Sequence, residues 1–425
     1  MNSIIKKVFD LKNNRTIYKG FLFTIFSFLN TGINFILLLV LSKFLTPAEY
    51  GYLNLFNTFI LLMMIFISFN AEKIIVVNFY NVSHKYTGET IVSVLLFSLV
   101  LFFIYSVITI IFASKLESYF GFSYIYVLMA IAYCYLSIYS YLNLTIWKAE
   151  DNPKSYGLYS VSLVLCNCIG TILLLVVFKM GWVSRALAQF MVAFSFFVFS
   201  IFFLLRKGYF SKKILPQKDK LKEALQFGLP LVPFNLSWWA IQGINRFIIN
   251  GSYGAVEVGL YSFATNFSNI IQIIGTSFVQ SYHVDVFKNL AENGQDCLPY
   301  YARFTKRMIF FYFIISCVIY ILCLFLIPIF FPSYKDSLSF LLPLCIGALA
   351  HCINQLFVCY LYYNKRTSTL MRITIVTSIL NVIFGVVYIK YNLLAAAYIS
   401  MFSEFAIMIS YIYYAQKLMN YNFFK

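Results

Sequence analysis

Apolar residues fall into twelve long runs along the chain, and polar residues gather in the short stretches between them. The runs cover residues 18–42, 52–70, 91–113, 122–147, 156–178, 182–206, 227–250, 256–282, 307–331, 337–362, 372–390 and 393–415. A helix crosses a hydrocarbon core of about 30 Å with about 20 apolar residues, whereas a transmembrane β-barrel needs alternating apolar and polar positions. The pattern therefore predicts an all-α integral membrane protein with about 12 transmembrane helices.

A strongly charged stretch, residues 207–226, divides the runs into six before it and six after it. It predicts a cytoplasmic linker between two six-helix bundles, at residues 1–206 and 227–425. Because six is an even number, both bundles would enter the membrane in the same orientation. They would then be related by a parallel pseudo-two-fold repeat, an arrangement found in transporters.

The two halves share residues at an offset of 208 positions. Eleven identities fall on residues 20–81, and among them Glu49 and Gly51 match Glu257 and Gly259. Both Glu-x-Gly corners stand at the outer beginning of an apolar run. We interpret them as marks of the register between the two halves.

The first corner also has the pattern of a helix start. Thr46 is a typical N-cap residue, Pro47 suits the first helical position, and Glu49 lies where its side chain can reach back to a free amide. Gly254 takes the place of Thr46 in the second corner, ahead of Glu257. The alternative, a role of the two glutamates in substrate binding, stays open at this point.

The charge of the chain reflects its membrane topology. The chain is 61% hydrophobic and 11% charged, with a net charge of +17 and a mean hydropathy of +0.81. With both termini in the cytoplasm, 25 Lys and Arg residues lie in inner segments and 6 in outer ones. This asymmetry predicts a multi-pass protein of the bacterial cytoplasmic (inner) membrane in contact with anionic lipids. No soluble basic domain exists, so nucleic acid is excluded as a partner.

The nine cysteines give no sign of a metal site. Nearly all lie inside apolar runs, and no pair has zinc-ligand spacing. They are expected to act as small apolar packing residues, and no bound metal or organic cofactor is expected.

Polar residues form a stripe on the first predicted helix that has a counterpart in the seventh. Asn30 and Asn34 lie one turn apart on one face, and the 208-residue offset places Asn34 on Gln242. Related stripes contain Asn235, Gln242 and Asn245 on the seventh helix and Asn266 and Asn269 on the eighth. Such residues either pack helices together through hydrogen bonds or line a polar cavity for substrate.

Two cations are candidates for contact with an anionic substrate group. Arg246 lies about 27 Å along the seventh helix from its cytoplasmic start, at 1.5 Å per residue. Lys43 follows the first helix on the outer side. The alternative for Arg246 is that its side chain reaches to the outer surface of the membrane.

Glu404 and His351 lie near the middle of their apolar runs, the twelfth and the tenth. A carboxylate at that depth must be protonated, paired or exposed to water. The two residues are therefore a candidate ion-coupling pair for protons or, less specifically, sodium. The alternative is a structural histidine held by hydrogen bonds.

Two stretches resemble a known family. Residues 227–261 read FGLPLVPFNLSWWAIQGINRFIINGSYGAVEVGLY, and residues 41–55 read LSKFLTPAEYGYLNL. They resemble the bacterial polysaccharide biosynthesis transport family of the multidrug/oligosaccharidyl-lipid/polysaccharide exporter superfamily. Asn245 departs from the family pattern, which often has Asp before this arginine.

The resemblance implies a flippase rather than an enzyme. It would move undecaprenyl-pyrophosphate-linked repeat units of O-antigen or capsule to the outer leaflet by alternating access, in association with polysaccharide polymerase machinery. One alternative is a cation-coupled multidrug antiporter of the same superfamily. The other is a membrane polymerase or glycosyltransferase, although the chain has neither a DxD motif nor a large outer loop.

Overall fold

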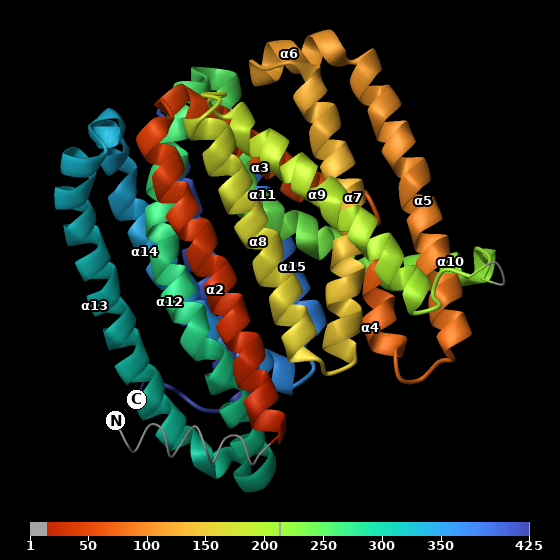
Figure 1. The fold of residues 1–425 in the computed structure, drawn as a ribbon. Helices are drawn as coiled ribbons and strands as arrows, with labels where there is room; N and C mark the ends of the chain where they lie inside the picture. The colour runs from red at the N-terminus through yellow and green to blue at the C-terminus, as the bar shows by residue number, and fades with distance from the viewer. Residues whose placement is uncertain (1–14, 212–213, 425) are drawn as a thin grey trace, which may run out of the picture. The chain divides into compact units, whose positions relative to one another are not determined.

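The computed structural model describes residues 15–211 and 214–424, and in these ranges the chain is helical and contains no strand (Figure 1). The described residues form two compact units. The first unit contains the residues up to Leu45 together with Phe56–Val232. The second contains Thr46–Leu55 and the residues from Pro233 onward. The helix that follows Thr46 therefore contributes to both units.

The helices follow one another with short connections. From the N-terminal side they are α2 (Arg15–Phe44), α3 (Pro47–Phe66), η1 (Ala71–Lys73), α4 (Ile74–Asn78), α5 (His84–Ile111), α6 (Ala113–Phe120), α7 (Tyr124–Ala149), α8 (Pro153–Val176), α9 (Val183–Arg206), α10 (Lys218–Gly228) and η2 (Leu229–Leu231). The second unit continues with α11 (Val232–Tyr253), α12 (Ala255–Asn293), η3 (Gly294–Cys297), α13 (Leu298–Phe330), η4 (Pro332–Ser337), α14 (Leu338–Tyr363), α15 (Thr367–Tyr388) and α16 (Ala395–Met419).

Each predicted apolar run lies mainly on one long helix, in the predicted order. The run 227–250 begins at the end of α10 and in η2 and continues along α11. Ten helical segments of the described chain are long and apolar enough to cross a membrane. One of them joins α12, η3 and α13 into a single stretch of 76 residues, and α11 is not among the ten. The polar residues of α11 lower its hydropathy. The prediction of an all-α multi-pass membrane protein is confirmed.

The predicted capping box at the start of α3 is present. The backbone N–H of Thr46 donates to Oε2 of Glu49 at 3.0 Å, and the N–H of Glu49 donates to Oγ1 of Thr46 at 3.3 Å. Gly254 is the N-cap of α12 with a φ of 90°, a conformation that glycine adopts without strain. Helix capping therefore accounts for these residues without a ligand.

Gly51 and Gly259 allow α3 and α12 to approach very closely within the second unit. A Cβ on Gly51 would lie 1.8 Å from the carbonyl oxygen of Ala255, and a Cβ on Gly259 would lie 1.9 Å from that of Pro47. The contact is reciprocal at the 208-residue offset, because Pro47 corresponds to Ala255. The corners are thus register marks and also the place where two helix starts meet. The repeat of whole bundles stays a prediction.

The predicted linker runs into a helix, α10, that belongs to the first unit. The Glu223 carboxylate of α10 accepts hydrogen bonds from the Tyr86 hydroxyl and from Nδ2 of Asn78. The Lys220 ammonium lies 3.5 Å from the centre of the Tyr86 ring. Polar contacts with α4 and α5 therefore hold α10 in place. The boundaries predicted for the two bundles, residues 1–206 and 227–425, stay a prediction.

The reciprocal glycine contact gives a stability prediction. Gly51→Ala is expected to destabilise the protein by about 1–3 kcal/mol, because the new methyl group would overlap a backbone carbonyl that cannot move aside cheaply. The measurement is the thermal unfolding of the purified protein in detergent. Gly32→Ala is the matched control, because a Cβ on Gly32 meets nothing within 4 Å. Equal melting temperatures for the two variants would contradict the prediction.

Candidate functional site

Glu404 of α16 and His351 of α14 form a buried pair. Nδ1 of His351 lies 3.1 Å from Oε2 of Glu404, and the two residues are 7% and 6% exposed. The rings of Trp238 and His351 pack in a T-shaped arrangement, with 6.0 Å between the ring centres. The structure therefore brings together the two residues that the sequence singled out near mid-depth. Their role in ion coupling stays a prediction.

Asn354 completes the environment of this carboxylate. Its Nδ2 donates to Oε2 of Glu404 at 3.2 Å, and its Oδ1 accepts from Nε2 of Gln355 at 3.1 Å. Nε2 of His283 on α12 lies 2.8 Å from the backbone oxygen of Gln355. Sequence reasoning missed Asn354, although it follows His351 by three residues and so shares its helix face.

The chemistry of the pair follows from its burial. A buried carboxylate is costly unless a partner offsets its lost hydration. An imidazole and a carboxylate in contact can hold one proton between them. Release of that proton would leave a net negative charge in the buried site, so the protonation state of the pair is tied to its surroundings. No group of three or more potential metal ligands occurs among the described residues.

Arg246 of α11 is held in place without a carboxylate. Its Nε donates to Oγ of Ser262 at 3.0 Å, and one terminal nitrogen donates to the backbone oxygen of Gln242 at 2.7 Å. None of the ion pairs found in the described chain includes Arg246. These two bonds use part of a guanidinium with five N–H donors, which leaves it able to bind an anion.

The other predicted substrate-binding residues of α11 and α12 differ in what they contact. Nδ2 of Asn266 donates to the buried Tyr50 hydroxyl at 2.7 Å. Asn235 and Asn269 are half-buried on α11 and α12, and the Gln242 side chain is exposed. Asn269 and Gln242 therefore stay accessible to solvent or ligand.

Asn245 has a different environment from its neighbour Arg246. It is only 1% exposed, and its Nδ2 donates to Oγ of Ser400 at 3.0 Å and to the backbone oxygen of Ala396 at 3.4 Å. These contacts join α11 to α16. The placement favours the helix-packing interpretation for Asn245 over contact with a substrate.

In the first unit, α2 carries three residues that the sequence predicts to contact substrate. Nδ2 of Asn34 donates to the backbone oxygen of Asn30 at 3.0 Å, while the Oδ1 atom of Asn30 is buried and accepts no hydrogen bond. Lys43 is exposed near the end of the helix.

The first unit holds another arginine that sequence reasoning assigned to an outer loop. Arg185 is in the first turn of α9 and donates to Oγ1 of Thr171 at 3.3 Å. One turn further on, Nε2 of Gln189 donates to Oδ1 of Asn57 at 3.3 Å, and the Gln189 Oε1 atom is buried and accepts no hydrogen bond. Arg185 therefore lies among polar groups of three helices. Because Arg185 lies at the edge of an apolar run, the sequence pattern did not indicate these polar contacts.

Comparison with known proteins identifies relatives of the chain. The sequence profile of a family described as "Polysaccharide biosynthesis protein" matches residues 17–283. The capsular polysaccharide biosynthesis protein CapF of Staphylococcus aureus is 22% identical over 395 residues, which cover 90% of this chain and 95% of CapF.

Two solved structures share the fold. The lipid II flippase MurJ in an inward closed conformation has a TM-score of 0.73 at 12% identity, covering 94% of this chain and 89% of MurJ. An inward-facing multidrug resistance transporter of the MATE family, in the MOP superfamily, has a TM-score of 0.70 at 16% identity. That match covers 92% of this chain and 94% of the transporter.

The buried pair predicts energetic coupling between His351 and Glu404. Replacing either by Ala leaves the other without its partner. The loss of unfolding free energy in the double variant should therefore be smaller than the sum of the losses in the two single variants, by about 0.5–3 kcal/mol. The measurement is a double-mutant cycle on free energies of unfolding in detergent. A cycle of His351→Ala with Asn266→Ala is the control, because Asn266 binds Tyr50 instead. Additive effects for His351 and Glu404 would contradict the prediction.

Proposed function

This chain belongs to the polysaccharide biosynthesis protein family, and we propose that it is a flippase for lipid-linked oligosaccharides. Its substrate is an undecaprenyl-pyrophosphate-linked repeat unit of capsule or O-antigen, which it carries from the cytoplasmic to the outer leaflet by alternating access. Two comparisons support the proposal. The relative CapF is named for capsular polysaccharide biosynthesis, and a lipid II flippase has the same fold.

The observation that carries the proposal is the environment of Arg246. A guanidinium inside a helix bundle is costly, and proteins keep one where it has a partner or a task. Here a hydroxyl and a backbone carbonyl orient the group, and no carboxylate within 4 Å in the described chain neutralises it. A pyrophosphate or an acidic sugar would supply the missing negative charge through paired hydrogen bonds.

The setting of the proposed flippase follows from its substrate. It acts in the cytoplasmic (inner) membrane of a bacterium with both termini in the cytoplasm, as the distribution of Lys and Arg favours. Its partners are the lipid-linked oligosaccharide, the surrounding lipids and the polymerase machinery that consumes the repeat unit. Transport needs no covalent chemistry and no organic cofactor.

An ion gradient would drive the movement through the buried pair in the second unit. Glu404 and His351 can hold one proton between them, and Asn354 orients the carboxylate. Uptake and release of that proton on opposite sides of the membrane would couple the gradient to transport. We favour protons over sodium because one member of the pair is a histidine, a side chain whose usual task is proton exchange.

One observation favours a second candidate function. Glu404 is a deeply buried carboxylate, and the fold is shared with a multidrug transporter. A cation-coupled antiporter for small molecules would use such a group directly. Vesicles containing the purified protein separate the two functions. A flippase moves labelled glycolipid between leaflets, whereas an antiporter exports organic cations against a proton gradient.

Arg246→Ala is expected to lower surface glycan and glycolipid flipping by about tenfold or more, because it removes charge-assisted hydrogen bonds to the substrate. Arg246→Lys should keep part of the activity, since the charge remains while the paired geometry is lost. The measurement is surface glycan per unit of membrane-inserted protein in a strain that lacks the native gene. Arg366→Ala, at an exposed cation between α14 and α15, is the control. Undiminished glycan in the Arg246→Ala strain would refute the assigned role.

Glu404→Gln is expected to keep the fold and remove the response of transport to a proton gradient. The amide matches the carboxylate in shape and can still accept from Asn354, but it carries no exchangeable charge. The measurement compares flipping in vesicles with and without an imposed pH difference. Asn381→Ala, at a buried amide that donates to Ser403 instead, is the matched control. An unchanged response in Glu404→Gln would exclude this coupling role.

A further inference from the structure

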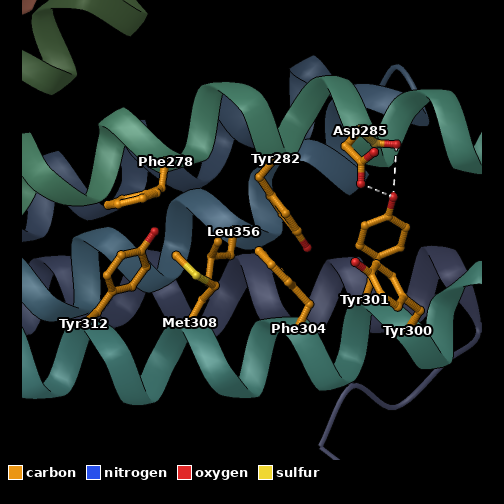
Figure 2. Close-up of a pocket in the computed structure, with 9 residues that line it drawn as sticks. All are labelled: Phe278, Tyr282, Asp285, Tyr300, Tyr301, Phe304, Met308, Tyr312 and Leu356. Carbon is orange, nitrogen blue, oxygen red and sulfur yellow. Dashed lines mark hydrogen bonds between the residues drawn. The ribbon is translucent and has the colours of Figure 1, made fainter. Parts of the chain in front are cut away.

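A crevice of about 260 Å³ lies in the second unit between α12 and α13, with Leu356 of α14 at its back (Figure 2). Six aromatic side chains line it, namely Phe278, Tyr282, Tyr300, Tyr301, Phe304 and Tyr312. Figure 2 shows the rings of the two helices facing one another across the space. Phe278 and Tyr300, which are 49% and 58% exposed, mark its open side.

The hydroxyls of Tyr282, Tyr301 and Tyr312 have partners within the protein. The Tyr282 hydroxyl shares hydrogen bonds with the hydroxyls of Thr305 at 3.3 Å and Tyr360 at 3.1 Å. The Tyr312 hydroxyl donates to the backbone oxygen of Gly275 at 3.3 Å. The walls therefore present mainly carbon to a ligand. Such a surface suits a hydrocarbon chain and offers little to a sugar.

The open side of the crevice lies where an apolar surface meets a basic one. Phe310 on α13 is 66% exposed, which is expected for a side chain facing hydrocarbon. Arg303 and Arg307 are exposed on the same helix. They follow Tyr300 and Phe304 by three residues, so they lie beside these rings on the helix surface. The positive-inside rule places this end of α13 at the cytoplasmic leaflet.

One carboxylate belongs to the lining. Asp285 lies at the end of the crevice near Tyr301, whose hydroxyl donates to Oδ2 at 2.7 Å and to the backbone oxygen of Asp285 at 3.1 Å (Figure 2). Its charge opposes the arginines and would repel an anionic group. The exposed cations Arg303, Lys306 and Arg307 outnumber it on the neighbouring surface.

We infer that this crevice binds one acyl chain of an anionic phospholipid of the cytoplasmic leaflet, with the phosphate of that lipid beside Arg303 and Arg307. The apolar walls fit the chain, and the adjacent guanidinium groups fit the phosphate. The inference goes beyond the proposed transport function and does not depend on it. A phospholipid is favoured over the polyprenyl substrate because the open side faces bulk lipid, where phospholipid is in large excess.

The test uses the purified, delipidated full-length protein in detergent. Phosphatidylglycerol should bind with saturation and raise the melting temperature, and phosphatidylcholine should bind more weakly. Each neutralised cation near the membrane surface should weaken phosphatidylglycerol binding about fivefold. Arg303→Gln with Arg307→Gln should therefore remove most of the preference, whereas the control Arg366→Gln should keep it. Native mass spectrometry counts the bound lipid.

Two further variants change the crevice itself. Met308→Trp should fill it and abolish saturable binding, whereas Phe310→Trp, on the exposed face next to it, should not. Asp285→Asn should tighten phosphatidylglycerol binding, because it removes the opposing charge. Equal affinity for the two phospholipids, or binding unchanged in both Met308→Trp and the double arginine variant, would overturn the inference. So would undecaprenyl phosphate displacing phosphatidylglycerol at equimolar concentration.

Discussion

A polar side chain inside hydrocarbon costs free energy unless protein groups complete its hydrogen bonds, and the arrangement of the second unit follows from this constraint. Asn245 meets it through its Nδ2 atom, which joins α11 to α16, while its buried Oδ1 atom accepts no hydrogen bond. Glu404 meets it through His351 and Asn354. Arg246 meets this constraint only in part. A hydroxyl and a carbonyl accept hydrogen bonds from its guanidinium group, but they do not balance its positive charge. Arg246 therefore keeps the capacity to bind a ligand.

The constraint also explains how far the sequence could predict the structure. Helix positions follow from the length of apolar runs, and the capping box at Thr46 and Glu49 follows from local hydrogen bonds. The 208-residue register anticipated that Gly51 and Gly259 are equivalent, but not that they touch. The partners of buried polar groups depend on how helices pack. Asn354 and the contacts of Arg185 were therefore missed, as was the packing of α10 against Tyr86 and Asn78.

Three places in the second unit suit three different ligands. Glu404 and His351 are buried together and suit a proton, which needs almost no space. Arg246 carries an unbalanced charge beside accessible amides and suits an anionic group with hydroxyls around it. The crevice of α12 and α13 turns its hydroxyls toward the protein and suits hydrocarbon. The first two chemistries are those that the proposed carrier for a charged oligosaccharide would use, whereas the third concerns the surrounding lipid.

Coupling between a proton and a substrate requires that the two sites bias a common element, and in the proposed flippase α16 would be that element. Ser400 lies one turn before Glu404 on this helix. Its hydroxyl accepts from Nδ2 of Asn245 at 3.0 Å and lies 2.9 Å from the hydroxyl of Tyr261. Asn245 precedes Arg246 in α11, and Tyr261 precedes Ser262, the residue that holds the guanidinium. A shift of α16 on protonation of Glu404 would therefore act on both helices that orient Arg246, through groups that are already hydrogen-bonded to one another.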